Sequence, residues 1–234
     1  MKWHISDITV RADALYAARA QLENVRASVE LLEEIVPNDD FEIAWRLGRA
    51  LFFLGQEEER KDEAHRLHAR GAAACARAAR SRPLHVEGHF WLGVNLALQA
   101  QTTRSLKALT LALRAKRSLE RAARINPAYH AAGPLRVLAR LKHKLPRLFG
   151  GGHRRARADF ARAILLAPAN TVTRLYFAEM LIDAGDVSSA RSELEAILSA
   201  PLNTAWAFET ARDRSHAQEL LQRLDSKARM KAEG

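Results

Sequence analysis

Cysteine is nearly absent from this sequence of 234 residues, because Cys75 is the only one. A disulfide within the chain is therefore impossible, and the composition gives no indication of an oxidising compartment. No stretch holds the roughly 18 uninterrupted apolar residues that a membrane span requires. The segment Met1–Asp7 has neither an apolar run of signal-peptide length nor a lipid-acceptor cysteine. We expect a soluble cytoplasmic protein, with a periplasmic location as the alternative if a leader precedes these residues.

Aromatic residues make up only 6% of the chain, and β-branched residues are also few. Alanine, leucine and arginine dominate instead, which favours helix over strand throughout. Since 48% of the residues are hydrophobic, the chain has enough apolar surface to bury a core and is not expected to be disordered. Its length suits one helical-repeat array or two small domains.

Signatures of catalysis and cofactor binding are missing as well. The sequence has no GK[ST] phosphate-binding motif, no HExxH motif and no recognisable Ser-His-Asp order. His85 and His89 have the spacing of two ligands on one helix face, but no third ligand accompanies them, so capping and packing are the expected roles. We therefore predict that the protein is not an enzyme and has no catalytic residues, no metal and no cofactor.

Three other candidates have simpler interpretations. His65 and His68 lie in a polar run and are expected to face solvent. The glycines at 150–152, followed by two arginines, have the composition of a phosphate-binding helix start, but a turn is the favoured interpretation. Cys75 is expected to be a small core residue, because a nucleophilic cysteine needs a nearby base.

The net charge of +10 is unevenly distributed. Residues 1–63 contain 8 lysines and arginines and 14 aspartates and glutamates, whereas residues 64–160 contain 20 and 3. All the excess positive charge therefore lies in the middle of the chain. Such a segment favours an acidic partner, nucleic acid or an anionic surface.

A repeat is clearest between residues 156 and 204. Ala156, Phe160 and Ala163, followed by Pro168, are spaced as in the second helix of a tetratricopeptide repeat. The next stretch, Thr171–Thr204, is one full period of about 34 residues without insertion. Small residues recur where two antiparallel helices must approach closely, and large ones recur beside them. Because no single helical pair buries its apolar face, such pairs must stack.

Prolines at 37, 83, 127, 168 and 201 divide the chain into units separated by 46, 44, 41 and 33 residues. We predict an all-α, right-handed α-solenoid of about five helical hairpins, forming a single domain over 1–234. The expected units are 6–39, 41–85, 86–129, 130–170 and 171–204, followed by a capping helix at 210–229.

Two units carry insertions and one contains a break. The second and third units hold about 11 and about 10 extra residues, near 56–70 and 100–107. These lengths keep an apolar stripe in phase, so we expect lengthened helices there. Gly55 is expected to end the first helix of the second unit. The proline and glycines of Leu145–Gly152 predict an ordered turn.

Three segments resemble a known family. They are HFWLGVN at 89–95, AGPLRVL at 132–138 with KLP at 144–146 and GG at 150–151, and NTVTRLY at 170–176. They resemble the hallmark blocks of TatT proteins, the tetratricopeptide-type component associated with some TRAP transporters. The repeat frame is also similar to that of the regulator of microtubule dynamics proteins. The resemblance extends over roughly Ala12–Leu221.

This resemblance implies an all-helical repeat protein without catalytic activity. TatT members are periplasmic lipoproteins that form homotrimers and contact a transporter substrate-binding protein, with a central cavity for apolar ligands. The present sequence differs in having no lipoprotein leader and no acceptor cysteine within it. By resemblance, the expected partner is a transporter substrate-binding subunit and the expected assembly is a homotrimer.

The principal candidate site is the inner wall of the stack, which the first helices of such repeats form. Large apolar side chains beside arginine suit a partner helix, an amphipathic peptide or an apolar ligand. The alternative is that the long inserted helices cover some of these side chains. The predicted wall residues are Trp45, Arg49, Phe52, Phe53, Phe90, Val94, Leu98, Leu175, Glu179 and Ile182.

A second candidate is the basic segment 104–124. Its cations include Arg114, Arg117, Arg121 and Arg124, and it is the alternative site for nucleic acid or an acidic partner. Grooves for single-stranded nucleic acid usually interleave cations with aromatic residues. Because this segment has none, nucleic acid is the less favoured partner.

Overall fold

The structure, a computed structural model, describes residues 4–34, 40–103 and 106–233, and within these ranges it contains helices and no strands. Pro37, the repeat boundary at Asp39 and the start of the basic segment at Arg104 lie outside the described residues. The chain divides into two compact units, residues 1–129 and 130–234, and each is described by itself. Their boundary coincides with the expected boundary between the third and fourth repeats.

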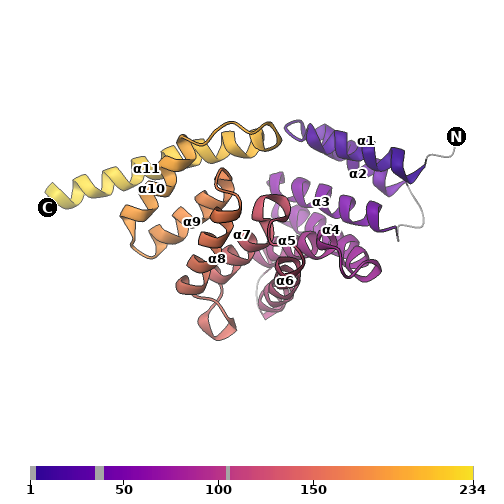
Figure 1. Ribbon diagram of the computed structural model, residues 1–234, viewed down its shortest axis with the longest axis horizontal. Coiled ribbons are helices and arrows are strands. Elements are labelled where there is room, and N and C mark those ends of the chain that lie inside the picture. Colours follow the sequence, from indigo (N-terminus) through magenta and orange to yellow (C-terminus); the bar gives the residue numbers. More distant parts are fainter. Residues whose placement is uncertain (1–3, 35–39, 104–105, 234) are drawn as a thin grey trace. The chain divides into compact units, whose positions relative to one another are not determined.

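Unit 1 consists of three consecutive helical hairpins (Figure 1). Each second helix packs against the first helix of the following hairpin, as the repeat pattern predicts. The helices are α1 (Ile5–Ala17), α2 (Leu22–Glu33), α3 (Phe41–Glu57), α4 (Lys61–Ser81), α5 (Val86–Thr102) and α6 (Leu106–Ile125).

Small residues let the helices of unit 1 approach closely. A Cβ atom at Gly48 of α3 would lie 1.9 Å from the Cys75 Sγ of α4, and one at Gly93 of α5 would lie 2.6 Å from Leu119 Cγ of α6. Cys75 is completely buried, and this burial raises the pKa of its thiol. The prediction that Cys75 is a small core residue is confirmed.

The helices of the second and third hairpins are longer than those of the first. α3 and α4 contain 17 and 21 residues, whereas α1 and α2 contain 13 and 12. The insertions therefore extend the helices, as expected. Gly55, however, does not end α3, which continues to Glu57. A Cβ at Gly55 would lie 2.6 Å from the His68 ring, so this glycine makes room for a side chain of α4.

His68 also corrects an expectation about the polar run. It is only 2% exposed instead of facing solvent. Burial lowers the pKa of its imidazole from 6.5 to about 4. His65 lies on the same helix, and its Nδ1 is 3.0 Å from Thr102 Oγ1 of α5.

Unit 2 contains two further hairpins and a long terminal helix (Figure 1). Its helices are α7 (Tyr129–Lys144, whose first residue belongs to unit 1), α8 (His153–Leu166), α9 (Thr171–Asp183), α10 (Val187–Leu198) and α11 (Ala207–Glu233), with short 3-10 segments η1 (Arg147–Phe149) and η2 (Thr204–Trp206). His130, Ala131 and Ala132 have positive φ angles of 51–59°, so the regular part of α7 begins near Gly133. The following Pro134 fits there, because proline is compatible with the first turn of a helix.

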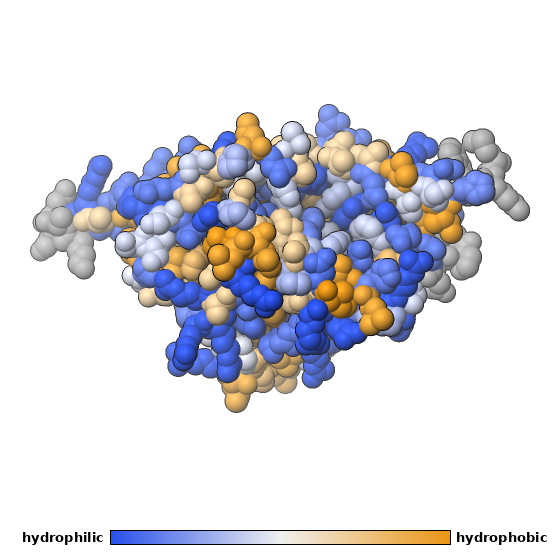
Figure 2. Space-filling view, in the orientation of Figure 1, coloured by the Kyte–Doolittle hydropathy of each residue, from blue (hydrophilic) through white to orange (hydrophobic). Residues whose placement is uncertain are grey.

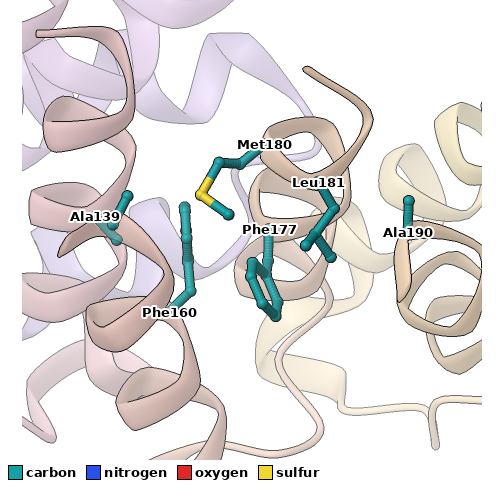
Figure 3. Close-up of a cluster of buried hydrophobic side chains, with 7 residues drawn as sticks. Ala139, Phe160, Phe177, Met180, Leu181 and Ala190 are labelled. Carbon is teal, nitrogen blue, oxygen red and sulfur yellow. The ribbon is translucent and has the colours of Figure 1, made fainter. Parts of the chain in front are cut away.

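The core of unit 2 forms where α7 and α8 meet α9 and α10. Phe160 of α8 and Phe177 of α9 stack with ring centroids 5.4 Å apart, and Met180 and Leu181 of α9 complete the cluster beside Ala190 of α10 (Figure 3). Full burial of each large side chain contributes about 2 kcal/mol to folding. Phe160 is thus placed as the repeat spacing predicts.

The last helix covers the terminal hairpin. α11 packs against α9 and α10, where Ala217 and Leu224 contact Leu175, Leu194 and Ile197. It contains 27 residues and is longer than the predicted helix at 210–229. Its position supports a capping role. Within the described ranges, no helix combines the length and the apolar character needed to cross a membrane.

Candidate partner-binding face

The first helices of the three hairpins in unit 1 are neighbours. α1 packs against α3, and α3 packs against α5. Their side chains therefore share one face, as expected for the first helices of a helical repeat. We call this the arginine–aromatic face and define it as Asp13 and Tyr16 of α1 together with Trp45, Arg46, Arg49 and Phe52 of α3.

Arg49 occupies the centre of this face. Its guanidinium carbon lies 4.0 Å from the centre of the Tyr16 ring and 5.0 Å from that of Trp45. Its Nη2 donates a hydrogen bond of 2.5 Å to Asp13 Oδ1. The cation is therefore held between two aromatic rings and a carboxylate that lies on a different helix.

Arg46 extends the arrangement by one helical turn. Its guanidinium carbon lies 4.2 Å from the Trp45 ring centre, and it donates hydrogen bonds to Asp13 at 3.0 Å and to Glu42 at 2.7 Å. Burial alone would raise the pKa of the Asp13 carboxyl, but hydrogen bonds and charges from Arg46 and Arg49 outweigh that effect and lower it. Asp13 is therefore ionised at neutral pH and serves both arginines.

A group of aromatic rings continues the face onto α5. Phe52 of α3 lies 5.3 Å from the ring of Trp91, and Trp91 donates a hydrogen bond of 3.1 Å to the Tyr129 hydroxyl. Phe90 contacts both Trp91 and Tyr129, with ring centroids 4.7 and 5.4 Å away. Burial raises the pKa of the Tyr129 hydroxyl, so it remains protonated.

Two buried polar atoms of α3 and α5 make no hydrogen bond within the described residues. They are Nε of Arg49, a donor, and Oε2 of Glu87, an acceptor that lies 3.9 Å from Nδ1 of His85. Buried polar groups are satisfied in the great majority of cases, and those that are not call for an explanation. A ligand with both acceptor and donor groups would satisfy them.

Several predicted wall residues are core residues instead. Phe53, Phe90 and Val94 are buried, with Phe90 only 1% exposed. Phe53 packs edge-on against Tyr16, at a centroid distance of 6.0 Å. Their burial corrects the expectation that they line an open wall. Trp45 is also largely buried, whereas Phe52 and Leu98 are half-buried.

The predicted wall residues of unit 2 are not open either. Leu175 is covered by α11, because that helix packs on the side of α9 that a further repeat would occupy. Glu179 forms an ion pair of 2.5 Å with Arg140 of α7. Ile182 is partly buried and packs against both core clusters of this unit.

The basic segment lies on α6. Arg114, Arg117 and Arg124 are exposed there and form no ion pair with a described carboxylate. Arg121 is half-buried and donates a hydrogen bond of 3.4 Å to the Pro83 carbonyl. Lys116, in contrast, pairs with Glu120 at 2.9 Å.

The histidines considered as ligands have packing partners. His85 precedes α5 and lies 5.0 Å from the Phe41 ring, while His89 Nε2 is 3.0 Å from the Pro83 carbonyl oxygen. Among the residues that the structure describes, no group of three or more His, Cys, Asp or Glu side chains is placed to hold a metal ion.

Sequence reasoning missed Asp13, Tyr16 and Arg46, all of which contact predicted residues. The repeat spacing in the sequence nevertheless indicates these contacts. Asp13 and Arg49 are 36 positions apart, and Trp91 and Tyr129 are 38 positions apart. Both separations are close to the length of one repeat in this part of the chain. Residues at equivalent positions of consecutive repeats are therefore candidates for contact.

These observations define a helical-repeat protein of the tetratricopeptide type. In a comparison with solved structures, the fold is similar to the crystal structure of TTC0263, a thermophilic TPR protein in Thermus thermophilus. The TM-score is 0.66, with 19% sequence identity over 89% of this chain and 97% of that one. This similarity confirms the predicted all-α helical-repeat fold.

The family follows from the sequence match. The family model described as regulator of microtubule dynamics protein 1-3 matches residues 8–135, more than half of the chain. The chain therefore belongs to this family. No curated protein matches it significantly.

Proposed function

We propose that this protein is a non-catalytic scaffold that binds a partner protein, or another amphipathic ligand, through the arginine–aromatic face of unit 1. The observation that carries the proposal is the environment of Arg49. Its guanidinium is fixed by Tyr16, Trp45 and Asp13, yet its buried Nε has no acceptor among the described residues. Arginine and large aromatic residues are also the types enriched at the energetic centres of protein interfaces.

The polar atoms of the face suit a peptide. Arg49 Nε provides a donor and Glu87 Oε2 an acceptor, while Phe52 and Leu98 provide half-buried apolar surface. A peptide segment carries both apolar side chains and polar groups of each kind. A purely apolar ligand would leave the two buried atoms unsatisfied, which is costly. An amphipathic segment of a protein partner is therefore the favoured ligand.

The test is site-specific photo-crosslinking in cells that make the protein. A photoreactive amino acid at Phe52 should capture a defined partner, while the same group at Val187, an exposed position of α10, should not. Adding Arg49→Gln should reduce the Phe52 crosslink by about tenfold or more, since hot-spot residues contribute about 2 kcal/mol or more to binding.

The matched control is Arg191→Gln, which breaks an exposed ion pair of similar length with Asp225, at 2.5 Å, in unit 2. It should leave the crosslink unchanged. Thermal unfolding of both variants separates loss of binding from loss of fold. A crosslink that persists in a folded Arg49→Gln protein would contradict the proposal.

A more specific form of the proposal follows from the resemblance to TatT proteins. The partner would then be a transporter substrate-binding subunit, and the protein would be a homotrimer. The segments AGPLRVL and NTVTRLY support this form. Light scattering after size exclusion gives the oligomeric state, and genes for transporter subunits beside the coding gene would support the role. A monomer without such neighbours would argue against this form alone.

The alternative is a basic-surface binder of nucleic acid or an acidic partner. It is supported by the exposed Arg114, Arg117 and Arg124 of α6. Arg114→Glu with Arg117→Glu should then abolish binding to RNA or to an acidic peptide, and wild-type binding should weaken steeply with salt. Binding that is absent at low salt, or insensitive to salt, would exclude it.

A further inference from the structure

The turn between α7 and α8 is closed by backbone hydrogen bonds and carries an exposed leucine, Leu148. The Gly152 amide donates a hydrogen bond of 2.8 Å to the Lys142 carbonyl, and the Gly151 amide donates one of 3.1 Å to the Pro146 carbonyl. A Cβ at Gly151 would lie 1.9 Å from the Leu145 carbonyl oxygen. Within this fixed backbone Leu145 is buried, whereas Leu148 is 87% exposed.

Cations surround this leucine. Residues 140–162 contain eight lysines and arginines and one acidic residue, Asp159. Two cations at the C-terminal end of α7 are paired: Lys142 with Asp159 at 2.6 Å, and Lys144 with Asp183 at 3.0 Å. The exposed cations of the turn, Arg147, Arg154 and Arg155, form no ion pair with a described carboxylate.

The three unpaired arginines lie close to the tip. Arg147 immediately precedes Leu148, and its side chain passes 3.5 Å from the position of a Cβ at Gly152, just before α8. Arg154 and Arg155 are in the first turn of α8. The apolar tip is therefore flanked by arginines on both sides of the turn.

Folding does not explain this arrangement. The N-terminus of a helix carries partial positive charge, so arginines in the first turn of α8 lower its stability. An exposed leucine likewise gains nothing from the fold, since its apolar surface stays in water. Figure 1 shows the turn as the loop that joins α7 to α8, and the space-filling view in the same orientation shows apolar residues beside hydrophilic ones (Figure 2).

We propose that the α7–α8 turn is a peripheral contact site for an anionic lipid surface. Leu148 enters the boundary between headgroups and acyl chains, while Arg147, Arg154 and Arg155 lie among the negative headgroups. Insertion of one leucine and attraction of three arginines to anionic headgroups are each weak. Together they produce stable binding to the membrane surface.

Nucleic acid and an acidic protein surface fit the turn less well. Single-stranded nucleic acid is usually bound through aromatic residues on which bases stack, and an exposed leucine offers no such platform. An acidic protein would satisfy the arginines but would need a matching apolar pocket for Leu148. An anionic bilayer presents negative headgroups above an apolar layer everywhere on its surface. It can therefore accept a single leucine flanked by cations without a matching pocket.

The experiment is co-sedimentation of the full chain with vesicles of phosphatidylcholine, alone or with about 30% phosphatidylserine. Wild-type protein should bind only the anionic vesicles, and binding should fall as salt rises from ~0.05 M to ~0.5 M. Arg154→Glu with Arg155→Glu should lower the partition coefficient by about 30-fold or more. Leu148→Ser should lower it by about tenfold, and Leu148→Trp should raise it.

Matched controls come from the same unit. Arg223→Glu with Lys227→Glu changes the net charge equally on the exposed part of α11, and Leu202→Ser changes a leucine that is 78% exposed in a segment without cations. Both should leave binding nearly unchanged. If the Arg154/Arg155 reversal fails to fold, Arg154→Gln with Arg155→Gln tests the same contact.

Three results would overturn the proposal. They are no binding of wild-type protein to anionic vesicles, equal loss of binding in the α11 control, and binding that Leu148→Ser leaves unchanged. If vesicles are not bound while RNA of comparable charge is, the turn is a nucleic-acid surface and the lipid proposal is wrong.

Discussion

Nη2 of Arg49 lies 2.5 Å from Oδ1 of Asp13, although the two residues are 36 positions apart. The contact links the first helices of two consecutive hairpins, α1 and α3. It also orients the guanidinium between the rings of Tyr16 and Trp45. The same pair therefore joins neighbouring repeats and fixes the geometry of the proposed binding face.

Loss of the Asp13 carboxylate should destabilise unit 1 in a pH-dependent way. Because the pKa of Asp13 is lowered in the folded state, its contribution is present above the ordinary aspartate pKa and is lost as pH falls through the lowered value. Asp13→Asn should cost about 1 kcal/mol at about pH 7, a modest value because the carboxylate is partly exposed.

Urea denaturation at several pH values measures this effect. The difference between Asp13→Asn and wild-type protein should shrink toward zero in acid. Asp225→Asn, which removes the exposed partner of Arg191, should cost less than about 0.5 kcal/mol at any pH. A cost for Asp13→Asn that does not change with pH would contradict the assignment.

Protonation of His68 should weaken folding. Burial lowers its pKa from 6.5 to about 4, so between these values the unfolded chain binds a proton that the folded chain excludes. Stability is therefore complete above 6.5 and falls as pH decreases toward about 4. Once the pH is below both pKa values, this effect lowers the free energy of unfolding by about 3 kcal/mol.

His68→Gln should remove this part of the pH dependence. The pKa of His143 in unit 2 is also lowered to about 4, mainly by burial, so its separate contribution should remain. The measurement is the free energy of unfolding at pH values across this range. An unchanged slope in His68→Gln would contradict this assignment.

A methyl group at Gly48 should separate α3 from α4. The added Cβ would lie 1.9 Å from Cys75 Sγ and 3.0 Å from the Gly71 carbonyl oxygen, so Gly48→Ala should cost about 1–3 kcal/mol through overpacking. Cys75→Ala removes the sulfur and should relieve part of this clash. A double-mutant cycle then gives a coupling energy of about 1 kcal/mol or more; additive costs would argue against the close approach.

Gly151 should be more sensitive than Gly185 to substitution by alanine. The Cβ at Gly151 would meet backbone, since the Leu145 carbonyl oxygen is only 1.9 Å away. Gly185 has open space around it but a φ angle of +79°, so Gly185→Ala should cost only about 1–2 kcal/mol of backbone strain. Differential scanning calorimetry compares the two, and a larger loss of melting temperature in Gly185→Ala would contradict this ranking.

Much of the helical framework was predictable from the sequence. The spacing of Ala156, Phe160 and Ala163 predicted a buried face of α8, and Phe160 lies at the centre of the core of unit 2. This works because only small side chains fit where helices cross, whatever the rest of the chain does. The insertions were likewise assigned to longer helices from their length.

The wall residues were harder to predict because one residue step turns a helix by about 100°. Phe52 and Phe53 are adjacent and equally apolar, yet only Phe53 is fully enclosed, against Tyr16 of α1. The position within a repeat favours burial of one of the two rings, but the side chain that covers Phe53 comes from another hairpin of unit 1. Asp13 and Arg46 could not be predicted as site residues for the same reason, because they contact each other across two consecutive repeats.

The amino-acid sequence by itself determined the helices, their pairing into hairpins and the small residues at their crossings, because these depend on steric fit and periodicity within about one repeat. Only the tertiary structure decided which surfaces stay available. α11 covers Leu175, and Gly55 admits the His68 ring, while Leu148 is held in solvent by the backbone of its turn. Exposure is a property of what packs from elsewhere in the chain, so local pattern predicts it least well.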